Sequence, residues 1–150
     1  MPYLYSEAMR AIENGWPTSV RAMALEFPED RTAWTCDAQF MLGSSILVAP
    51  VFCETGEVEF YLPEGTWTSF WADAETISGP KWVKQTHDFT TLPMYVREGT
   101  VLVLGLEEEK RSDYDWMDSA NRIVKHYGKT EGVVFELKDA KDEVSEAVSA

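Results

Sequence analysis

The sequence predicts a mainly β protein, in which an antiparallel sandwich or barrel follows one helix and one buried strand. Three observations support this fold class. From Ser45 onward, short β-rich runs recur about every 8 to 12 residues, with turn signals between them. Before Gly43 the pattern is that of a helix followed by an apolar strand, as in a parallel α/β element. A chain of 150 residues, 45% of them hydrophobic, can also bury a sizeable core.

The first predicted element is a helix over residues 1–14. Its apolar residues recur at helical spacing: Leu4, Tyr5, Ala8, Met9 and Ile12. Asn14 and Gly15, followed by Pro17, provide a stop signal. Because Met1 lies inside this pattern with no capping residue ahead of it, we expect the start of the sequence to be truncated.

Residues 17–28 predict a strand that is covered on both faces. Apart from Arg21, the segment is apolar at both odd and even positions, which point to opposite faces of a strand. A proline bounds it at each end. Residues 29–43 predict a short helix, because apolar residues fall four apart before a terminating glycine: Trp34, Ala38, Leu42 and Gly43.

The predicted β region consists of six runs, which are ILVAPVF, EVEFYLP, TWTSFWA, KWVKQTHDF, MYVREGT and VLVLG. Residues typical of turns separate them: Glu54–Gly56, Pro63–Gly65, Ser78–Pro80, Leu92–Pro93 and Glu98–Gly99. Short β-rich runs separated by turn residues favour an antiparallel sandwich or barrel.

The remainder of the chain changes character again near Gly105. The charged stretch LEEEKRSDYD predicts a linker or exposed loop, and two strands are expected around Gly128 and Gly132. The final ten residues are polar and predict a frayed end. We therefore divide the chain into the end of one domain (residues 1–43), a whole small β domain (44–104), and a linker with the start of another β domain (105–150).

Charge and composition limit the function classes. A formal net charge of −13 disfavours binding to nucleic-acid phosphates or anionic lipid surfaces, so neutral partners are expected. The N-terminus has no basic region followed by an apolar core, and no apolar run reaches the roughly 20 residues of a membrane span. This favours a cytoplasmic, non-membrane protein, a question that a truncated start leaves open.

Neither a metal site nor a cofactor site is recognisable. Cys36 and Cys53 form no CxxC pair, while His87 and His126 stand far apart in the sequence. One disulfide is the most that two cysteines allow, and free thiols are the commoner state in a reducing compartment. We predict free thiols.

Five motifs occur in an order that resembles the closing part of glycoside hydrolase family 31, which contains α-glucosidases and α-xylosidases. They are Pro2–Tyr5, Arg21 with Glu26–Pro28, Gln39–Val51, Tyr61–Trp67 and Val96–Gly99. The resemblance spans Met1 to about Leu104. Three further stretches, GEVEFYLPEGTWT, QTHDFTTLPMYVREGTVLVLG and DYDW, are closer to the α-xylosidase branch.

The sequence departs from the family pattern at four positions. Ala22 and Met23 stand where the family usually has Pro and Leu, Ala38 replaces a common acidic residue, and Ser44 replaces a frequent aspartate. These differences leave the predicted fold intact but weaken any inference about hydrogen bonding near them.

The resemblance implies a fold for each part of the chain. Residues 1–43 would contain the last helix and strand of a (β/α)8 catalytic barrel, and residues 44–104 would form the proximal C-terminal β-sandwich. The linker and the start of a distal β domain would follow. An unbroken apolar strand that begins at Ile46 and stops at Pro50 is then expected, because it helps to build the sandwich core.

The resemblance also implies a function. Family members hydrolyse α-linked glycosides with retention, using two aspartates on earlier barrel strands, and neither motif occurs in this sequence. We predict no catalytic residue in this chain, which alone would be inactive, with an α-linked oligosaccharide and the remaining barrel as partners. Alternatives are a non-catalytic carbohydrate-binding β-sandwich module and an interaction domain that uses the orphaned helix and strand.

A few side chains are candidates for a site. Arg21 would support the sugar site of the complete barrel or form a structural ion pair that holds the strand, and we favour the ion pair. An acidic cluster surrounds that strand: Glu26, Glu29, Asp30 and Asp37. The cluster is expected to be solvated surface, with Asp30 as a possible cap.

Aromatic and turn residues complete the candidates. Trp67, Trp71 and Trp82 could stack on sugar rings, but strand alternation favours core packing. His87 is expected to be a hydrogen-bonding loop residue. Arg97 and Glu98 are expected in a turn, where Arg97 could also pair across the junction between the first two parts of the chain.

Overall fold

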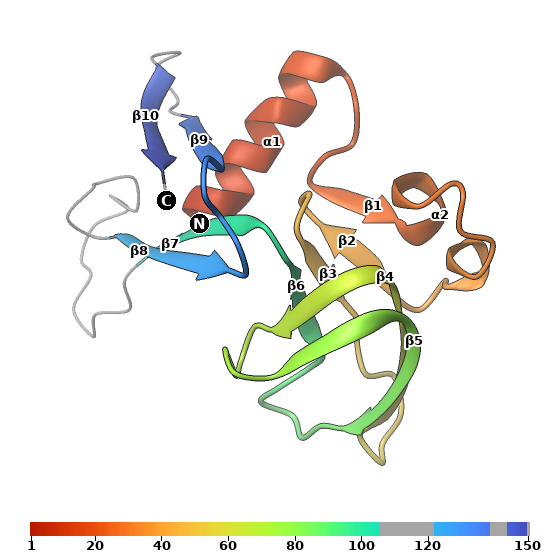
Figure 1. Ribbon diagram of the computed structural model, residues 1–150. Helices are drawn as coiled ribbons and strands as arrows, with labels where there is room; N and C mark the ends of the chain where they lie inside the picture. The colour runs from red at the N-terminus through yellow and green to blue at the C-terminus, as the bar shows by residue number, and fades with distance from the viewer. Residues whose placement is uncertain (106–121, 139–143, 150) are drawn as a thin grey trace. The chain divides into compact units, whose positions relative to one another are not determined.

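The computed structural model describes residues 1–105, 122–138 and 144–149 (Figure 1). These residues fall into two compact units, one made of residues 17–98 and the other of residues 1–16 with 99–150. Every strand pair among them is antiparallel, and helices are few. The predicted mainly β, antiparallel fold class is confirmed. The division into residues 1–43, 44–104 and 105–150 stays a prediction.

A six-stranded sheet of order β1-β2-β3-β6-β4-β5 forms the unit of residues 17–98. Its strands are β1 (Val20–Ala22), β2 (Phe40–Leu42), β3 (Ile46–Val48), β4 (Glu57–Ser69), β5 (Thr76–Thr86) and β6 (Met94–Arg97). Two short helical segments lie between β1 and β2, namely α2 (Met23–Glu26) and a 3-10 turn (Ala33–Thr35). The long β4–β5 hairpin is visible in Figure 1.

The core of this unit consists of fully buried apolar side chains from several strands: Met23, Met41, Leu47, Phe60, Leu62, Trp67 and Tyr95. Phe60 and Tyr95 pack with ring centroids 5.4 Å apart. Strand β3 is buried along its whole length, as predicted for a central strand. Because aromatic residues bury large areas, this cluster accounts for much of the unit's hydrophobic stabilisation.

Two predicted elements before β3 are corrected by the structure. The strand expected over residues 17–28 is only three residues long and is not covered on both faces, because Val20 is exposed while Arg21 is buried. The chain then turns into α2, which places Met23 in the core. The helix expected within residues 29–43 is a single 3-10 turn. Side-chain bonds to the backbone, such as Asp30 Oδ1 accepting from Thr32 N–H at 2.9 Å, compete there with helix formation.

Pro63–Gly65 was predicted to be a turn but lies inside β4. The register of β4 with β5 shifts between Leu62 and Gly65, as at a β-bulge, which accommodates a proline within the strand. The indole of Trp67 donates to the Pro63 carbonyl at 2.9 Å. Across the hairpin, a Cβ on Gly79 would lie 1.9 Å from that same carbonyl oxygen. The predicted turn at Ser78–Pro80 is therefore part of β5, and only glycine fits at position 79.

The other unit contains α1 (Pro2–Asn14), β7 (Thr100–Gly105), β8 (Arg122–Tyr127), β9 (Val134–Lys138) and β10 (Val144–Ser149). Strand β7 pairs with β8, and β9 pairs with β10. The helix ends as predicted, with Gly15 in the left-handed conformation at φ 64°. The strands expected around Gly128 and Gly132 are present as β8 and β9, whereas β10 replaces the predicted frayed end. The charged linker and the DYDW stretch lie outside the described residues.

The buried face of α1 differs from the predicted one. Leu4 and Ile12 are 37% and 75% exposed, whereas Tyr3, Ser6 and Glu7 are buried. Tyr3 stacks on Phe135 of β9 at 5.9 Å. Glu7 is held by an ion pair with Arg10 at 2.6 Å, which satisfies its charge. The face of the helix that carries Tyr3, Ser6 and Glu7 is therefore the buried one, and Leu4 and Ile12 remain exposed.

Candidate functional site

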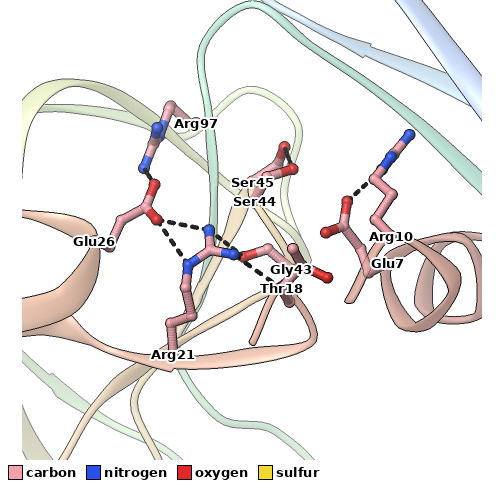
Figure 2. A network of polar contacts seen from close by, with 9 residues as sticks. All are labelled: Glu7, Arg10, Thr18, Arg21, Glu26, Gly43, Ser44, Ser45 and Arg97. Atoms are coloured by element: carbon pink, nitrogen blue, oxygen red, sulfur yellow. Dashed lines mark hydrogen bonds and ion pairs between the residues drawn. The ribbon is translucent and has the colours of Figure 1, made fainter. Parts of the chain in front are cut away.

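Arg21 occupies the centre of a polar network that lies next to the core of the six-stranded sheet (Figure 2). Its Nε donates to Glu26 Oε2 at 2.8 Å, and its terminal nitrogen lies 2.6 Å from the same oxygen. The remaining donors reach the carbonyls of Thr18 at 3.2 Å and Gly43 at 3.4 Å. A buried guanidinium is thus paired with a carboxylate and with carbonyls, as its burial requires.

Glu26 joins Arg21 to a second guanidinium. Its other oxygen, Oε1, accepts from Arg97 at 2.8 Å, so one carboxylate bridges two cations with one oxygen each (Figure 2). Arg97 also lies over two aromatic rings, 5.2 Å from the centroid of Phe27 and 5.6 Å from that of Trp67. Arg97 therefore contributes through its charge and through cation–π stacking.

The network fastens three parts of the chain together. Arg21 comes from β1, Glu26 from α2 and Arg97 from the end of β6, 71 residues after Glu26. Two of the five sequence motifs supply these residues, Arg21 with Glu26–Pro28 and Val96–Gly99. Both Glu26 oxygens accept hydrogen bonds from guanidinium groups. This carboxylate therefore links β1, α2 and β6 and is not a free acid or base.

A cleft of about 670 Å³ lies beside this network, and its lining includes Glu26, Phe27, Asp30, Tyr61 and Pro80. The Tyr61 hydroxyl donates to Asp30 Oδ2 at 2.7 Å. Burial, followed by this contact with Asp30, raises the pKa of Tyr61 to about 12. Tyr61 is therefore a neutral phenol throughout the physiological range, and it is fixed by a carboxylate.

Gln39 fixes the backbone at the same place. Its side-chain amide donates to the Tyr61 carbonyl at 2.8 Å and accepts from the Tyr61 N–H at 2.7 Å. Gln39 is 5% exposed, so these bonds satisfy a buried amide and a stretch of β4 backbone together. The Gln-Phe motif thus has a structural role in positioning the cleft wall.

The structure places the remaining acidic candidates at the surface. Glu29 lines the cleft and is exposed, and Asp37 is exposed. Asp30 does not cap a helix, but it binds the Thr32 N–H and the Tyr61 hydroxyl. Glu98 is an exposed turn residue whose N–H donates to the Thr66 carbonyl.

Core packing is confirmed for one of the three tryptophans. Trp67 is fully buried, whereas Trp71 and Trp82 are about half exposed. Trp82 points from the outer strand β5 and packs on Tyr61, with ring centroids 5.4 Å apart. His87 is a hydrogen-bonding residue as predicted, because its ring nitrogens contact Thr91 Oγ1 and Gln85 Oε1, each at 3.1 Å.

Both cysteines are free thiols, as predicted, but their environments differ. Burial, with smaller contributions from Asp30 and Asp37, raises the pKa of Cys36. Cys53 is exposed, and a hydrogen bond with Thr55 is the main cause that lowers its pKa. Within the described residues, no group of three or more His, Cys, Asp or Glu side chains is arranged to hold a metal ion. No helix in the same residues is long and apolar enough to cross a membrane.

Sequence reasoning missed the contacts that define the cleft. Asp30 and Tyr61 are 31 residues apart, and Gln39 and Tyr61 are 22 apart, so no local pattern indicates that they meet. Gln39 in its apolar run is the one sequence signal for these contacts, because a buried amide needs hydrogen-bond partners such as backbone groups.

Comparison with known proteins shows which family profile and which enzymes this chain resembles. Residues 16–102 match the family profile described as "Glycosyl hydrolase family 31 C-terminal domain". An α-xylosidase of Emericella nidulans is 40% identical over 116 residues, which is 73% of this chain and 15% of that protein. An α-glucosidase of Saccharolobus solfataricus is 35% identical over 72% of this chain and 15% of its own length.

Solved structures give the same result. A cycloalternan-forming enzyme from Listeria monocytogenes, solved with a pentasaccharide substrate, superimposes with a TM-score of 0.81 at 29% identity. The match covers 95% of this chain and 14% of that enzyme. The chain therefore spans about one seventh of the length of each of these three proteins, and the family profile covers the residues of the six-stranded sheet.

Proposed function

Because the chain belongs to glycosyl hydrolase family 31, we propose that it is the C-terminal portion of a retaining α-glycosidase that hydrolyses O-glycosyl bonds of α-linked glucosides or xylosides. The observation that carries this proposal is the family match over residues 16–102, combined with coverage of only 15% of the α-xylosidase and α-glucosidase relatives. The partners in such an enzyme are an α-linked oligosaccharide and the remainder of the catalytic barrel.

In this proposal the chemistry belongs to residues outside this chain. Retention needs two carboxyl groups about 5 to 5.5 Å apart, one acting as nucleophile and one as acid and base. Of the four carboxylates that line the cleft, two have other bonds: Glu26 holds two arginines, and Asp30 holds the Tyr61 hydroxyl. The chain contributes scaffold and interdomain surface.

The surface of α1 supports a scaffold role. Leu4 and Ile12 lie on an exposed face of the helix, and the opposite face already packs on β9 through Tyr3. Exposed apolar surface of this kind is stabilised when another element covers it. The remaining barrel is the partner that we propose for this face.

Arg21 is a positioning residue in the proposed enzyme. It touches Glu26 and two backbone carbonyls, and those bonds hold β1 against α2 and against the turn between β2 and β3 that begins at Gly43. Any effect on a sugar site of the complete barrel would pass through the position of β1.

The decisive experiment compares this chain with the longest reading frame that contains it. The longer product should hydrolyse p-nitrophenyl α-glucoside or α-xyloside with retention, followed by NMR of the anomeric proton, and it should contain the two catalytic aspartates. The 150-residue chain alone should show no turnover. Turnover by the chain alone, or a longer frame without the aspartate pair, would overturn the proposal.

A further inference from the structure

We propose that the cleft beside Tyr61 is a non-catalytic binding site for a neutral oligosaccharide, with Trp34 and Trp82 as its flanking aromatic platforms. The proposal rests on this cleft alone and does not depend on the catalytic function proposed above. It concerns a surface of the unit of residues 17–98, which is itself compact.

Two exposed tryptophans adjoin the lining of the cleft from opposite segments. Trp82 is 48% exposed and packs on Tyr61, a lining residue, at 5.4 Å. Trp34 is 58% exposed, and its indole N–H donates to the carbonyl of Pro28, another lining residue, at 2.8 Å. Each ring is therefore anchored by a contact with a lining residue and keeps about half of its surface exposed, which suits a stacking platform.

The polar groups of the cleft suit hydroxyl donors. Each Asp30 oxygen accepts one hydrogen bond, from Thr32 N–H and from the Tyr61 hydroxyl. A carboxylate offers about four acceptor positions, so Asp30 retains capacity for ligand hydroxyls. Glu29 and Glu64 also line the cleft. Sugar hydroxyls can donate to these oxygens. The carboxylates outnumber Arg31, the one guanidinium of the lining, so an anionic ligand is disfavoured.

The combination of shape and chemistry selects the ligand class. A cleft of about 670 Å³ falls within the range of about 300 to 1,000 Å³ that is usual for small-molecule sites. A pyranose presents an apolar C–H face to an aromatic ring and a rim of hydroxyls to carboxylates. Aromatic platforms beside acceptor oxygens fit such a molecule better than a purely apolar ligand or a phosphate ester.

The test is a titration of the full 150-residue chain with isomaltotriose and with maltotriose, followed by isothermal titration calorimetry and indole N–H NMR shifts. At least one sugar should bind at millimolar concentration. Trp34→Ala and Trp82→Ala should each weaken that binding about tenfold. Maltotrionic acid, an anion of similar size to maltotriose, should bind more weakly than maltotriose.

Trp71→Ala is the matched control. Trp71 is 51% exposed, and its indole donates to the Leu92 carbonyl at 2.7 Å, so it has the exposure and anchoring of Trp34. Trp34 and Trp82 each contact a residue that lines the cleft, whereas Leu92 does not line it, so the loss of Trp71 should leave affinity unchanged. Trp82→Phe keeps a ring against Tyr61 and should retain most of the binding. Its comparison with Trp82→Ala separates the loss of the aromatic ring from a loss caused by misfolding.

Three results would overturn the site. The first is a flat response of the folded wild-type chain to both trisaccharides, and the second is an equal loss of affinity in Trp71→Ala. The third is binding that persists unchanged in both Trp34→Ala and Trp82→Ala. None of these results bears on the search for catalytic aspartates in a longer reading frame, so the two proposals fail separately.

Discussion

Replacing Glu26 with glutamine should destabilise the unit of residues 17–98 more than the loss of any surface ion pair. The substitution keeps the shape of the side chain but removes the charge that bridges Arg21 and Arg97. It also turns an amide N–H₂ toward one of the two guanidiniums, where only an acceptor fits. Arg21 then keeps only its bonds to the carbonyls of Thr18 and Gly43.

The expected cost follows from the exposure of each partner. The Arg21 side chain is 6% exposed, so its guanidinium becomes a buried charge without a counter-ion, a change that typically costs about 3 to 5 kcal/mol. The Arg97 side chain is 37% exposed, and solvent can replace most of its lost pairing. Since Glu26 is itself partly accessible, we expect a loss of about 3 kcal/mol in the free energy of unfolding.

Urea unfolding followed by tryptophan fluorescence measures this loss, because Trp67 lies against Arg97 in the same unit. The matched control is Glu57→Gln, which breaks an ion pair of 3.4 Å with Lys84 whose side chains are 63% and 54% exposed. That control should cost less than about 0.5 kcal/mol. Adding Arg21→Met to Glu26→Gln should recover stability, because it removes the orphaned charge. Equal losses in Glu26→Gln and Glu57→Gln would refute the reasoning.

Three further predictions concern the backbone, a buried phenol and the two thiols. Gly79→Ala should cost at least about 3 kcal/mol because its Cβ meets a carbonyl oxygen at 1.9 Å, whereas Gly132→Ala, with φ 76° and free space, should cost about 1 kcal/mol in urea unfolding. The pKa of Tyr61 is raised from 10.0 to about 12 in the folded chain, so wild-type stability should fall between pH 10 and 12 more steeply than that of Tyr61→Phe. Ellman's reagent should label Cys53 quickly and Cys36 slowly, and Cys53→Ser should abolish the fast phase.

The fold class could be predicted because periodicity and turn residues are local signals. Strand β3 is uninterrupted in its apolar pattern and is buried throughout, and Gly15 ends α1 where the sequence placed a stop. The extent of β1 could not be predicted, because Arg21 and Met23 are buried through contacts with distant segments. The apolar stripe of α1 was recognised, but its buried face depends on Phe135, more than 100 residues away in sequence.

The candidate site was predictable only in part. The burial of a cation in an apolar strand required a carboxylate partner for Arg21, and Glu26 is that partner. The second half of the network was anticipated only in outline. Arg97 was expected at a turn, from which it could pair with the first part of the chain, and it lies at the end of β6 and pairs with Glu26. No local pattern indicated that partner, which lies 71 residues earlier. Strand alternation assigns side chains to two faces but does not indicate which face is covered. Trp82 was therefore expected in the core, whereas it is about half exposed.

The walls of the cleft come from the segments where local sequence rules failed. The loop from Pro28 to Thr32 was expected to begin a helix, and Pro63 and Pro80 were expected in turns that end strands. In each case a tertiary bond overrides the local preference: Asp30 to Tyr61, Trp67 to Pro63, and the close approach of Gly79 to Pro63. Segments whose local sequence preference disagrees with their final conformation are concentrated at functional or strained sites, because such disagreement does not help a chain to fold. The coincidence of these failures with one aromatic-flanked cleft is therefore an independent reason to test that cleft for ligand binding.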